Sequence, residues 1–250
     1  MFNILGETYR IAYGDLCFFR RNIVQVVISS TIGPLLYLLA FGYGMRSGNT
    51  GGLDVSYLAY VVPGIVSITT LTAGFASSSQ KILIQREFFS SFDELILSPM
   101  HTSSIVFGKS VIGMLKGIIG ASIMLILGKI LEPSIQITVP LVLIILFCCL
   151  TFSLLGVMAG LLAHSTPTLN MISSIIILPM TFMCGTLFSV SSLPDWASAI
   201  IWALPLTHSS EMIRSCALGL EFPWVSLAVM AVYFTVMLTV DYTIIRKKLY

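Results

Sequence analysis

The sequence has few charged residues. Only 10% of its 250 residues are Asp, Glu, Lys or Arg, whereas 56% are hydrophobic and the mean hydropathy is +0.97. Soluble domains carry about 25% charged residues, so a soluble enzyme is excluded. The many aromatic and branched aliphatic residues exclude a disordered chain, and a net charge of +2 does not indicate a nucleic-acid partner. These features predict an integral membrane protein.

Residue patterns for catalysis or metal binding are also lacking. The five cysteines have no metal-site or disulfide spacing: Cys17, Cys148, Cys149, Cys184 and Cys216. Gly108-Lys109-Ser110 resembles the end of a phosphate-binding loop, but Ser103 stands where that loop requires glycine. Asp241 is the only acidic residue inside an apolar segment, which argues against a proton-coupled transporter. We therefore expect no catalytic residue, no metal site and no cofactor bound by this chain.

Long apolar segments define the expected architecture. A membrane span needs about 20 apolar residues, and six segments qualify: Ile23–Tyr43, Tyr57–Ser78, Ile105–Leu131, Val139–Leu162, Thr168–Phe188 and Val225–Ile245. The sequence therefore predicts a single all-α integral membrane domain over 1–250 with six transmembrane helices. An even number of spans places both termini on the same side of the membrane.

The basic residues indicate which side that is. With cytosolic termini, nine flank the inner ends of the spans: Arg10, Arg20, Arg21, Lys81, Arg86, Lys109, Arg246, Lys247 and Lys248. Three flank the outer ends: Arg46, Lys129 and Arg214. Because cytosolic flanks are enriched in Lys and Arg, we expect a multi-pass protein of the plasma membrane with both termini in the cytosol.

The first segment, 1–22, has a helical apolar stripe. Its members recur at spacings of three and four residues: Leu5, Tyr9, Ala12, Leu16 and Phe19. The stripe favours an amphipathic helix lying in the plane of the membrane. An ordinary solvated N-terminal helix is the alternative.

Two long connections separate the spans. The inner one, 79–104, is the more charged, and a helix from Ile82 to Met100 is expected to lie between the bilayer and a soluble partner; its apolar face is Ile82, Phe89, Phe92 and Ile96. The outer one, 189–223, is too apolar for a free loop. We expect a re-entrant helical hairpin there, with a break at Pro205, a second helix capped by Thr207 and its end at Gly219. The hairpin would cover the outer end of a pathway or serve as an interfacial lid.

One charge lies inside a span. Lys116 is about 16 Å along the third span if that helix starts at Ile105. It either faces an internal pathway, pairs across the bundle, or extends its ammonium group towards the membrane surface. Stripes of small residues predict close helix packing in spans three and four: Gly113, Gly117 and Ala121, then Gly156 and Gly160.

Several short motifs are distributed along the chain. They are Tyr60-Val-Val-Pro63-Gly64-Ile65, Arg86-Glu87-Phe88, Leu97-Ser98-Pro99, Gly108-Lys109, Leu178-Pro179-Met180, Cys184-Gly185-Thr186-Leu187-Phe188, and Leu193-Pro194 followed by Pro205-Leu206-Thr207-His208 and Arg214. Together these motifs resemble those of one family, the membrane subunits of ABC-2 type exporters. The resemblance covers essentially the whole chain, which is most similar to the permeases of nodulation lipo-oligosaccharide export and of daunorubicin-type drug resistance. Ser189 departs from it, since many relatives carry proline there.

The resemblance implies a permease dimer, a homodimer in the simplest case, bound to two copies of a separate ATPase that holds ATP and Mg²⁺. It also implies site residues. Arg86, Glu87, Glu94 and Pro99 would contact the ATPase, although a solvated helix face would carry the same charges. Pro205, His208 and Arg214 would shape an outer gate, although capping and anchoring explain them too.

Two other function classes stay open at this level. A secondary transporter or channel would need no ATPase, and a membrane-embedded protease or lipid transferase would need a catalytic set that the sequence lacks. A neighbouring reading frame for an ATPase separates the exporter from both. The expected substrate class is broad: an amphipathic drug, a lipid-linked molecule or an oligosaccharide.

Overall fold

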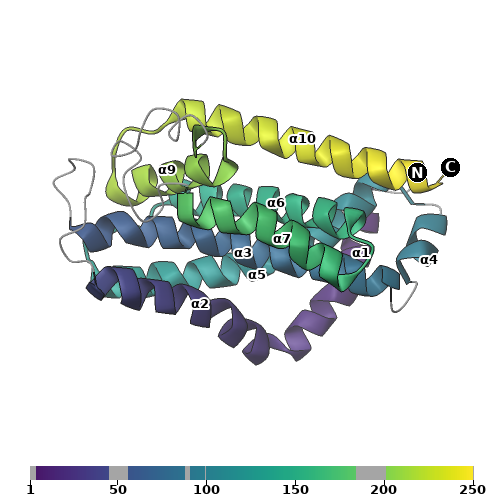
Figure 1. Ribbon diagram of the computed structural model, residues 1–250, viewed down its shortest axis with the longest axis horizontal. Helices are drawn as coiled ribbons and strands as arrows, with labels where there is room; N and C mark the ends of the chain where they lie inside the picture. Colours follow the sequence, from purple (N-terminus) through teal and green to yellow (C-terminus); the bar gives the residue numbers. More distant parts are fainter. Residues whose placement is uncertain (1–3, 45–55, 88–90, 99, 184–200, 250) are drawn as a thin grey trace.

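The computed structural model describes residues 4–44, 56–87, 91–98, 100–183 and 201–249. Within these ranges every regular element is an α-helix (Figure 1). The helices are α1 (Ile4–Arg21), α2 (Ile23–Gly44), α3 (Tyr57–Glu87), α4 (Ser91–Leu97), α5 (Thr102–Leu131), α6 (Val139–Leu162), α7 (Thr166–Met183), α9 (Pro205–Leu218) and α10 (Trp224–Leu249).

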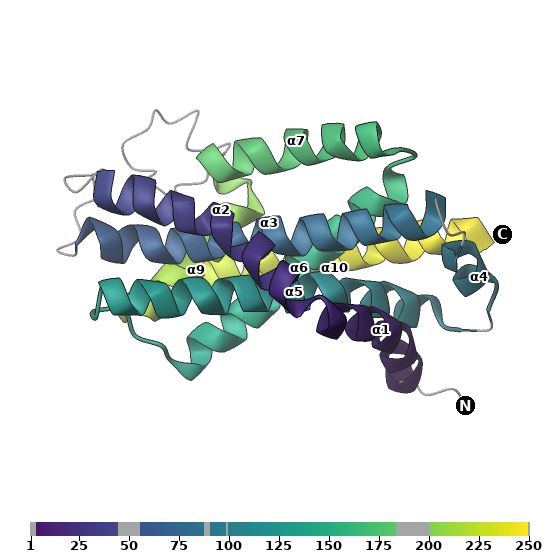
Figure 2. The same cartoon turned by 90° about the horizontal axis from the view of Figure 1, so that it is seen from below.

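The long helices run along one axis of an elongated bundle. Figures 1 and 2 show α3, α5 and α6 at its centre, with α10 on one side and α2 on the other. Both chain termini and α4 lie at one end, here called the terminal end, and α9 lies at the opposite end. α7 runs along the outside of the bundle, apart from α5 (Figure 2).

Five of the described helices are long and apolar enough to cross a membrane: α2, α3, α5, α6 and α10. They coincide with five of the expected spans, and the predicted integral membrane protein is confirmed at that level. The remaining expected span corresponds to α7, whose apolar stretch Thr166–Phe182 is shorter. The end of that expected span, beyond Met183, lies outside the described residues. That the chain crosses the membrane six times therefore stays a prediction.

Small residues let α3, α5 and α6 pack closely, as the glycine stripes predicted. A Cβ atom at Gly156 would lie 2.5 Å from the backbone oxygen of Phe75 and 2.9 Å from its Cα. A Cβ atom at Gly160 would lie 2.7 Å from the Ser79 oxygen. Across the same contact, the hydroxyls of Ser78 and Ser153 lie 2.6 Å apart. Only glycine permits this backbone approach without displacement, so the three helices form one tightly packed block.

The inner connection 79–104 differs from its prediction. It is not one helix from Ile82 to Met100, because α3 continues without a break to Glu87 and α4 is a separate element. Ile82 and Phe92 are both buried in one apolar cluster at the terminal end. The expected face is thus divided between two helices, while Phe89 and the Ile96 side chain lie outside the described residues.

The first helix is confirmed, but its inner face is not the predicted stripe. Ala12 and Phe19 pack inside, whereas Leu5 and Tyr9 are exposed. The buried face of α1 carries Glu7, Ile11 and Asp15 instead; their spacing of four residues places all three on one side. The exposed apolar residues remain available to contact lipid, so the in-plane placement stays a prediction.

Candidate coupling, pathway and gating sites

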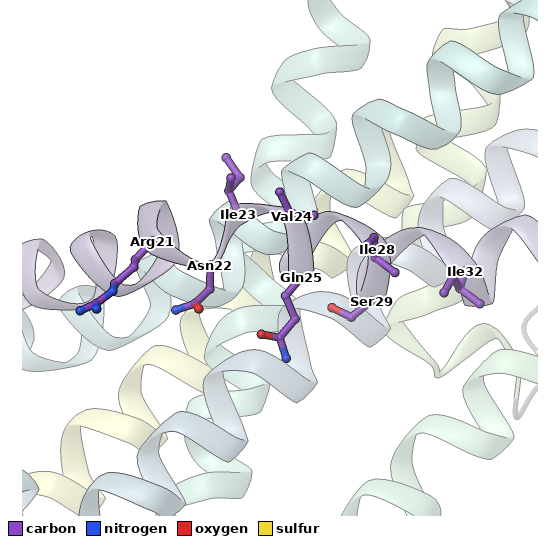
Figure 3. Close-up of a pocket in the computed structure, with 8 residues that line it drawn as sticks. All are labelled: Arg21, Asn22, Ile23, Val24, Gln25, Ile28, Ser29 and Ile32. Atoms are coloured by element: carbon purple, nitrogen blue, oxygen red, sulfur yellow. The ribbon is translucent and has the colours of Figure 1, made fainter.

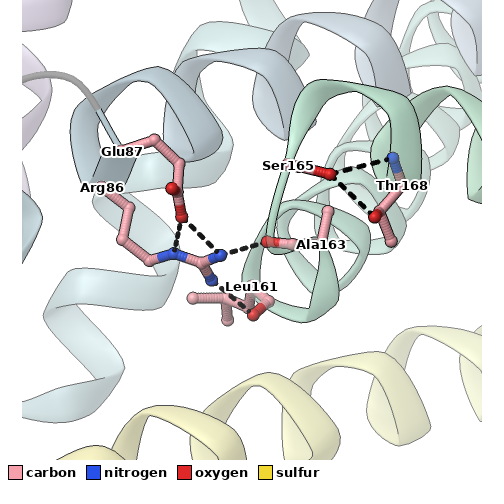
Figure 4. Close-up of polar contacts among 6 residues, drawn as sticks. All are labelled: Arg86, Glu87, Leu161, Ala163, Ser165 and Thr168. Carbon is pink, nitrogen blue, oxygen red and sulfur yellow. Dashed lines mark hydrogen bonds and ion pairs between the residues drawn. The ribbon is translucent and has the colours of Figure 1, made fainter.

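Arg86 connects the last turn of α3 to the turn that joins α6 and α7 (Figure 4). Its Nη1 donates a hydrogen bond to the carbonyl oxygen of Leu161 at 2.8 Å, and its Nη2 donates to that of Ala163. Glu87 holds the same guanidinium with an Nη2–Oε1 distance of 3.1 Å. The Arg86 side chain is only 11% exposed. Arg86 therefore fixes the end of α6, where the last carbonyls of a helix lack partners within the helix.

The start of α7 is fixed next to this contact. Ser165 precedes the helix, and its hydroxyl accepts the backbone N–H of Thr168 at 3.4 Å and lies 2.9 Å from the Thr168 hydroxyl (Figure 4). This is the usual N-cap arrangement. The turn between α6 and α7 is thereby held on both sides, by Arg86 of α3 and by the cap of α7.

The residues expected to contact an ATPase have different environments. Arg86 points into the protein and Glu87 pairs with it, whereas the Glu94 side chain on α4 is exposed. Pro99 lies outside the described residues. Of the four, Glu87 and Glu94 are thus exposed, and Glu87 is already paired with Arg86.

A polar contact between α1 and the start of α5 was not predicted from the sequence. Glu7 accepts the backbone N–H of His101 at 3.0 Å, and the His101 Nδ1 lies 3.1 Å from its other oxygen. His101 precedes the first turn of α5, where a negative charge is stabilised by the helix dipole. The backbone hydrogen bond from His101 keeps the pKa of Glu7 below its usual 4.5.

A second polar contact ties α1 to two other helices. Asp15 lies between two lysines, with its Oδ1 3.2 Å from the Nζ of Lys81 on α3 and its Oδ2 3.8 Å from the Nζ of Lys109 on α5. Asp15 and Lys109 are buried. One sequence feature could have indicated this contact: the four-residue spacing of Glu7, Ile11 and Asp15 places two acidic residues on a single helix face.

Lys116 lies at the middle of α5, half-buried, beside two hollows on the side of the bundle that faces α2. A third and larger hollow, of about 630 Å³, follows the bend between α1 and α2 (Figure 3). Its lining runs along one stretch of chain: Arg21, Asn22, Ile23, Val24, Gln25, Ile28, Ser29 and Ile32. The side of α5 that faces α2 is therefore hollowed. The side of α5 that faces α3 and α6, the other two helices of the central block, is closely packed.

At the opposite end, Pro205 starts α9 and Gly219 ends it with a left-handed φ of 69°. Both positions agree with the predicted second helix of the hairpin. Thr207 is not its cap, because the helix begins earlier and Leu204 is the N-cap; the Thr207 hydroxyl donates instead to the Ile201 oxygen at 2.6 Å. The expected first helix of the hairpin lies mostly outside the described residues.

His208 and Arg214 attach α9 to its neighbours. His208 is buried, with Nε2 2.8 Å from the Trp202 oxygen and Nδ1 3.0 Å from the hydroxyl of Ser226 on α10. The Arg214 guanidinium carbon lies 3.7 Å from the ring centre of Tyr60 on α3, a cation–π contact, and its Nε donates to the Tyr60 oxygen at 3.3 Å. The two predicted residues thus join α9 to α10 and α3.

Comparison with known proteins supplies the family. A family model described as "ABC-2 type transporter" matches residues 11–218, which include Arg86, Lys116, His208 and Arg214. This chain belongs to the ABC-2 type transporter family. The resemblance drawn from the short motifs is thereby confirmed.

Named relatives of this ABC-2 chain cover most of its length. The inner membrane transport permease YadH of Escherichia coli K12 is 23% identical over 92% of this chain and 90% of its own. Nodulation protein J of Neorhizobium galegae is 25% identical over 92% of each chain. Nodulation protein J of Rhizobium leguminosarum bv. trifolii is 28% identical over 80% of this chain and 79% of its own. The ABC-2 chain is therefore a multi-pass membrane permease of the ABC transporter class rather than an enzyme.

Proposed function

We propose that this chain is the membrane subunit of an ATP-driven exporter. Two copies would associate with two copies of a separate ABC ATPase, which binds ATP and Mg²⁺, and would move an amphipathic drug, a lipid-linked molecule or an oligosaccharide outward. Membership of the family supports the ATPase partnership, because ABC-2 permeases generally work with ABC ATPases. A secondary transporter or channel is the alternative that the tests below must exclude.

The proposed topology has six spans, with α7 as the fifth, and places both termini in the cytosol. The proposed location is the plasma membrane. The apolar stretch of α7 is about 26 Å long at 1.5 Å per residue, close to the hydrocarbon thickness of about 30 Å. The excess of basic residues near the terminal end supports the orientation. The terminal end would then face the ATPase.

The observation on which the proposal depends most is the length of α3, which contacts other parts of the bundle near both of its ends. This helix has 31 residues and is about 46 Å long. At the terminal end its Arg86 holds the α6–α7 turn, and at the opposite end its Tyr60 contacts Arg214 of α9. Between them, the Ser67 hydroxyl contacts that of Ser209. A push on the terminal end is thus passed to α9 through one rigid helix.

The push would come from the ATPase at α4 and at the α6–α7 turn. α4 carries the exposed Glu94, and the turn is bound to α3 by Arg86. At the outer end, α9 would act as a gate: Pro205 fixes its start, His208 anchors it to α10, and Arg214 anchors it to α3. Motion of α3 relative to α10 would strain these two anchors and open the outer end.

Co-purification with the ATPase encoded in a neighbouring reading frame tests the proposal. We expect a stable complex whose ATP hydrolysis is stimulated by a transported amphiphile in proteoliposomes. Glu94→Lys should weaken the complex, whereas Glu221→Lys, a matched change on an exposed carboxylate at the opposite end, should leave it intact. Transport that follows an ion gradient without any ATPase would contradict the proposal and favour a secondary transporter.

A further inference from the structure

Two hollows meet at Lys116. One, of about 450 Å³, lies towards the terminal end and is lined by Phe19, Val26, Ser77, Gln80, Lys81, Ile84, Ile112 and Lys116. The other, of about 310 Å³ and here called the upper hollow, lies towards the opposite end and is lined from α2, α3, α5 and α7. Volumes of this size accommodate small organic ligands. Lys116 alone lines both, so a molecule lying along this side of the bundle would pass its ammonium group.

The charged residues among the described lining of the two hollows, Lys81 and Lys116, are both positive. Lys81 and Lys109 share the single carboxylate of Asp15, and Lys129 donates to the Ile135 oxygen at 2.8 Å. Lys116 makes no hydrogen bond or ion pair with any residue in the described part of the chain. No carboxylate is among the described residues that line either hollow. An ammonium group at the middle of a span requires a counter-charge or water, and the described residues supply no counter-charge.

A second polar group in the upper hollow also lacks a partner. Ser30 on α2 is only 5% exposed, and its Oγ has no hydrogen-bond partner among the described residues. Ser30 lines the same hollow as Lys116. It lies against Gly120, one helical turn from Lys116 on α5, where a Cβ atom would be 3.6 Å from the Ser30 Cβ. A buried hydroxyl without a partner is unfavourable, so this hollow is lined by two donors without a partner among the described residues, Lys116 on α5 and Ser30 on α2.

Other hydroxyls around the hollow are already used within their own helices. Ser29 donates to the Val26 oxygen, Thr72 to the Ile68 oxygen and Thr181 to the Ile177 oxygen. The rest of the lining is largely apolar, including Ile68 and Phe182. The hollow therefore has a narrow polar spot at Lys116 and Ser30 within an apolar surface, which matches a ligand with one charged group and an apolar chain.

We propose that Lys116 and Ser30 bind the acidic head group of an amphipathic anion, such as a lipid phosphate, whose apolar chain lies along the hollows between α2 and the central block. The ammonium group supplies the counter-charge, and the Ser30 hydroxyl donates to a second oxygen of the same head group. As an assignment of substrate class this rests on the proposed export function, but the binding itself requires no ATPase. The bilayer can supply such an anion as phosphatidylglycerol, and an exported molecule can supply it as a single-chain phosphate.

Native mass spectrometry of the full-length chain in neutral detergent tests the proposal directly. The probes are palmitoyl lysophosphatidic acid, uncharged monopalmitoylglycerol, phosphatidylglycerol and inorganic phosphate. One charge-assisted contact contributes about 1.4 kcal/mol, or about tenfold in Kd. We therefore expect lysophosphatidic acid to bind about tenfold more tightly than monopalmitoylglycerol, and inorganic phosphate to bind weakly. Comparable Lys116-dependent binding of phosphatidylglycerol would also support the site and identify a bilayer lipid as its occupant.

The variants isolate the role of Lys116. Lys116→Gln should remove the tenfold preference and Lys116→Arg should retain it. Ser30→Ala should reduce it by about threefold, because the uncharged hydroxyl contributes less than the ammonium group. Lys129→Gln, a matched loss of charge in the last turn of α5, should bind as the wild type does. Ala76→Leu fills the upper hollow without changing any charge, and it should weaken both lipids equally.

Three results would overturn the proposal. Unchanged lipid preference in Lys116→Gln would show that the lysine does not bind the head group. Inorganic phosphate binding as tightly as lysophosphatidic acid would show a free-anion site. A Lys116→Gln variant that loses its dimer while keeping lipid binding would show that Lys116 faces a second copy of the chain. Failure of the ATPase to co-purify would count against the proposed function and leave these binding results unaffected.

Discussion

The two faces of α5 differ in how they are packed. Towards α3 and α6, Gly113 and Gly117 allow backbones and short side chains to approach closely, and a Cβ atom at Gly117 would lie 3.0 Å from the Cys149 sulfur. Towards α2, Lys116 opens onto hollows of about 310 and 450 Å³. Helix α5 thus belongs to the closely packed block on one face and lines the hollows on its other face.

This difference assigns separate tasks to the two faces. A closely packed interface moves as a unit because its side chains have few alternative positions. An open, partly polar side accepts a ligand or allows a neighbouring helix to shift. We infer that α3, α5 and α6 transmit motion, while α2 and α7 rearrange around the substrate. The predictions below test this division, beginning with the largest expected effect.

Adding a methyl group should be far more harmful on the packed side than on the open side. Gly156→Ala places a Cβ atom 2.5 Å from the Phe75 backbone oxygen, so one of the helices must shift. We expect a loss of about 3 kcal/mol in the free energy of unfolding, measured by thermal melting in detergent. Gly33→Ala on α2 is the matched control, because its Cβ atom meets nothing within 4 Å. It should gain up to about 1 kcal/mol from helix propensity, and equal losses in both variants would refute the division.

Loss of Arg86 should uncouple the rigid block from α7. Arg86→Ala leaves the carbonyl oxygens of Leu161 and Ala163 without their donor, which costs about 2 kcal/mol. We expect the complex with the ATPase to form and hydrolyse ATP while export falls strongly. Arg246→Ala, an exposed change at the same end, serves as the control. Export at the wild-type rate by Arg86→Ala would remove this residue from the coupling path.

The outer anchors should affect export more than stability. Arg214→Ala removes a cation–π contact with Tyr60 and a hydrogen bond to the Tyr60 backbone oxygen, which together are worth about 2 kcal/mol. If α9 is a gate, export should fall much further than this small loss of stability explains. His208→Ala should behave similarly, since it detaches α9 from Ser226 on α10. Wild-type export by both variants, measured in proteoliposomes, would leave α9 as an anchor without a gating role.

The contact between α1 and α5 should give the smallest effect, and one that depends on pH. The pKa of Glu7 is below its usual 4.5 in the folded protein, so its stabilising contribution is present above pH 4.5 and is lost as the pH falls through the lower folded value. Glu7→Gln should therefore melt at a lower temperature than the wild type at pH 7. The difference should shrink as the pH is lowered below about 4.5. A difference that is constant over this range would exclude the ionised carboxylate as its cause.

The helix boundaries were largely predictable because hydropathy and helix length are local properties. The predicted Val139–Leu162 coincides with α6, and the predicted Ile23–Tyr43 differs from α2 by one residue. The end of α3 was missed by nine residues, since Ser79–Glu87 is polar enough to end a span without ending a helix. Hydropathy reports where a helix leaves the lipid, whereas the helix continues as long as its backbone hydrogen bonds do.

The contacts between distant segments were not predictable. The carbonyl partners of Arg86 belong to the backbone and have no sequence signature, and the Asp15–Lys81–Lys109 cluster joins three helices. Both depend on which face of each helix points into the bundle. For α1, the apolar stripe predicted the wrong inner face. The position of Lys116 along its helix was predicted, but the hollows beside it are lined from several helices whose relative placement the sequence does not indicate.

Spin-label distances provide the most direct test of a rigid block beside a mobile side. Labels at Ile130 on α5 and Leu143 on α6 report on the block, and labels at Leu143 and Ile175 on α7 report across its boundary; all three positions are exposed. The complex with its ATPase would be measured without nucleotide and after trapping with ATP and vanadate. The account predicts an unchanged distance between Ile130 and Leu143 and a shifted distance between Leu143 and Ile175. A shift within the block together with a constant distance to α7 would contradict it.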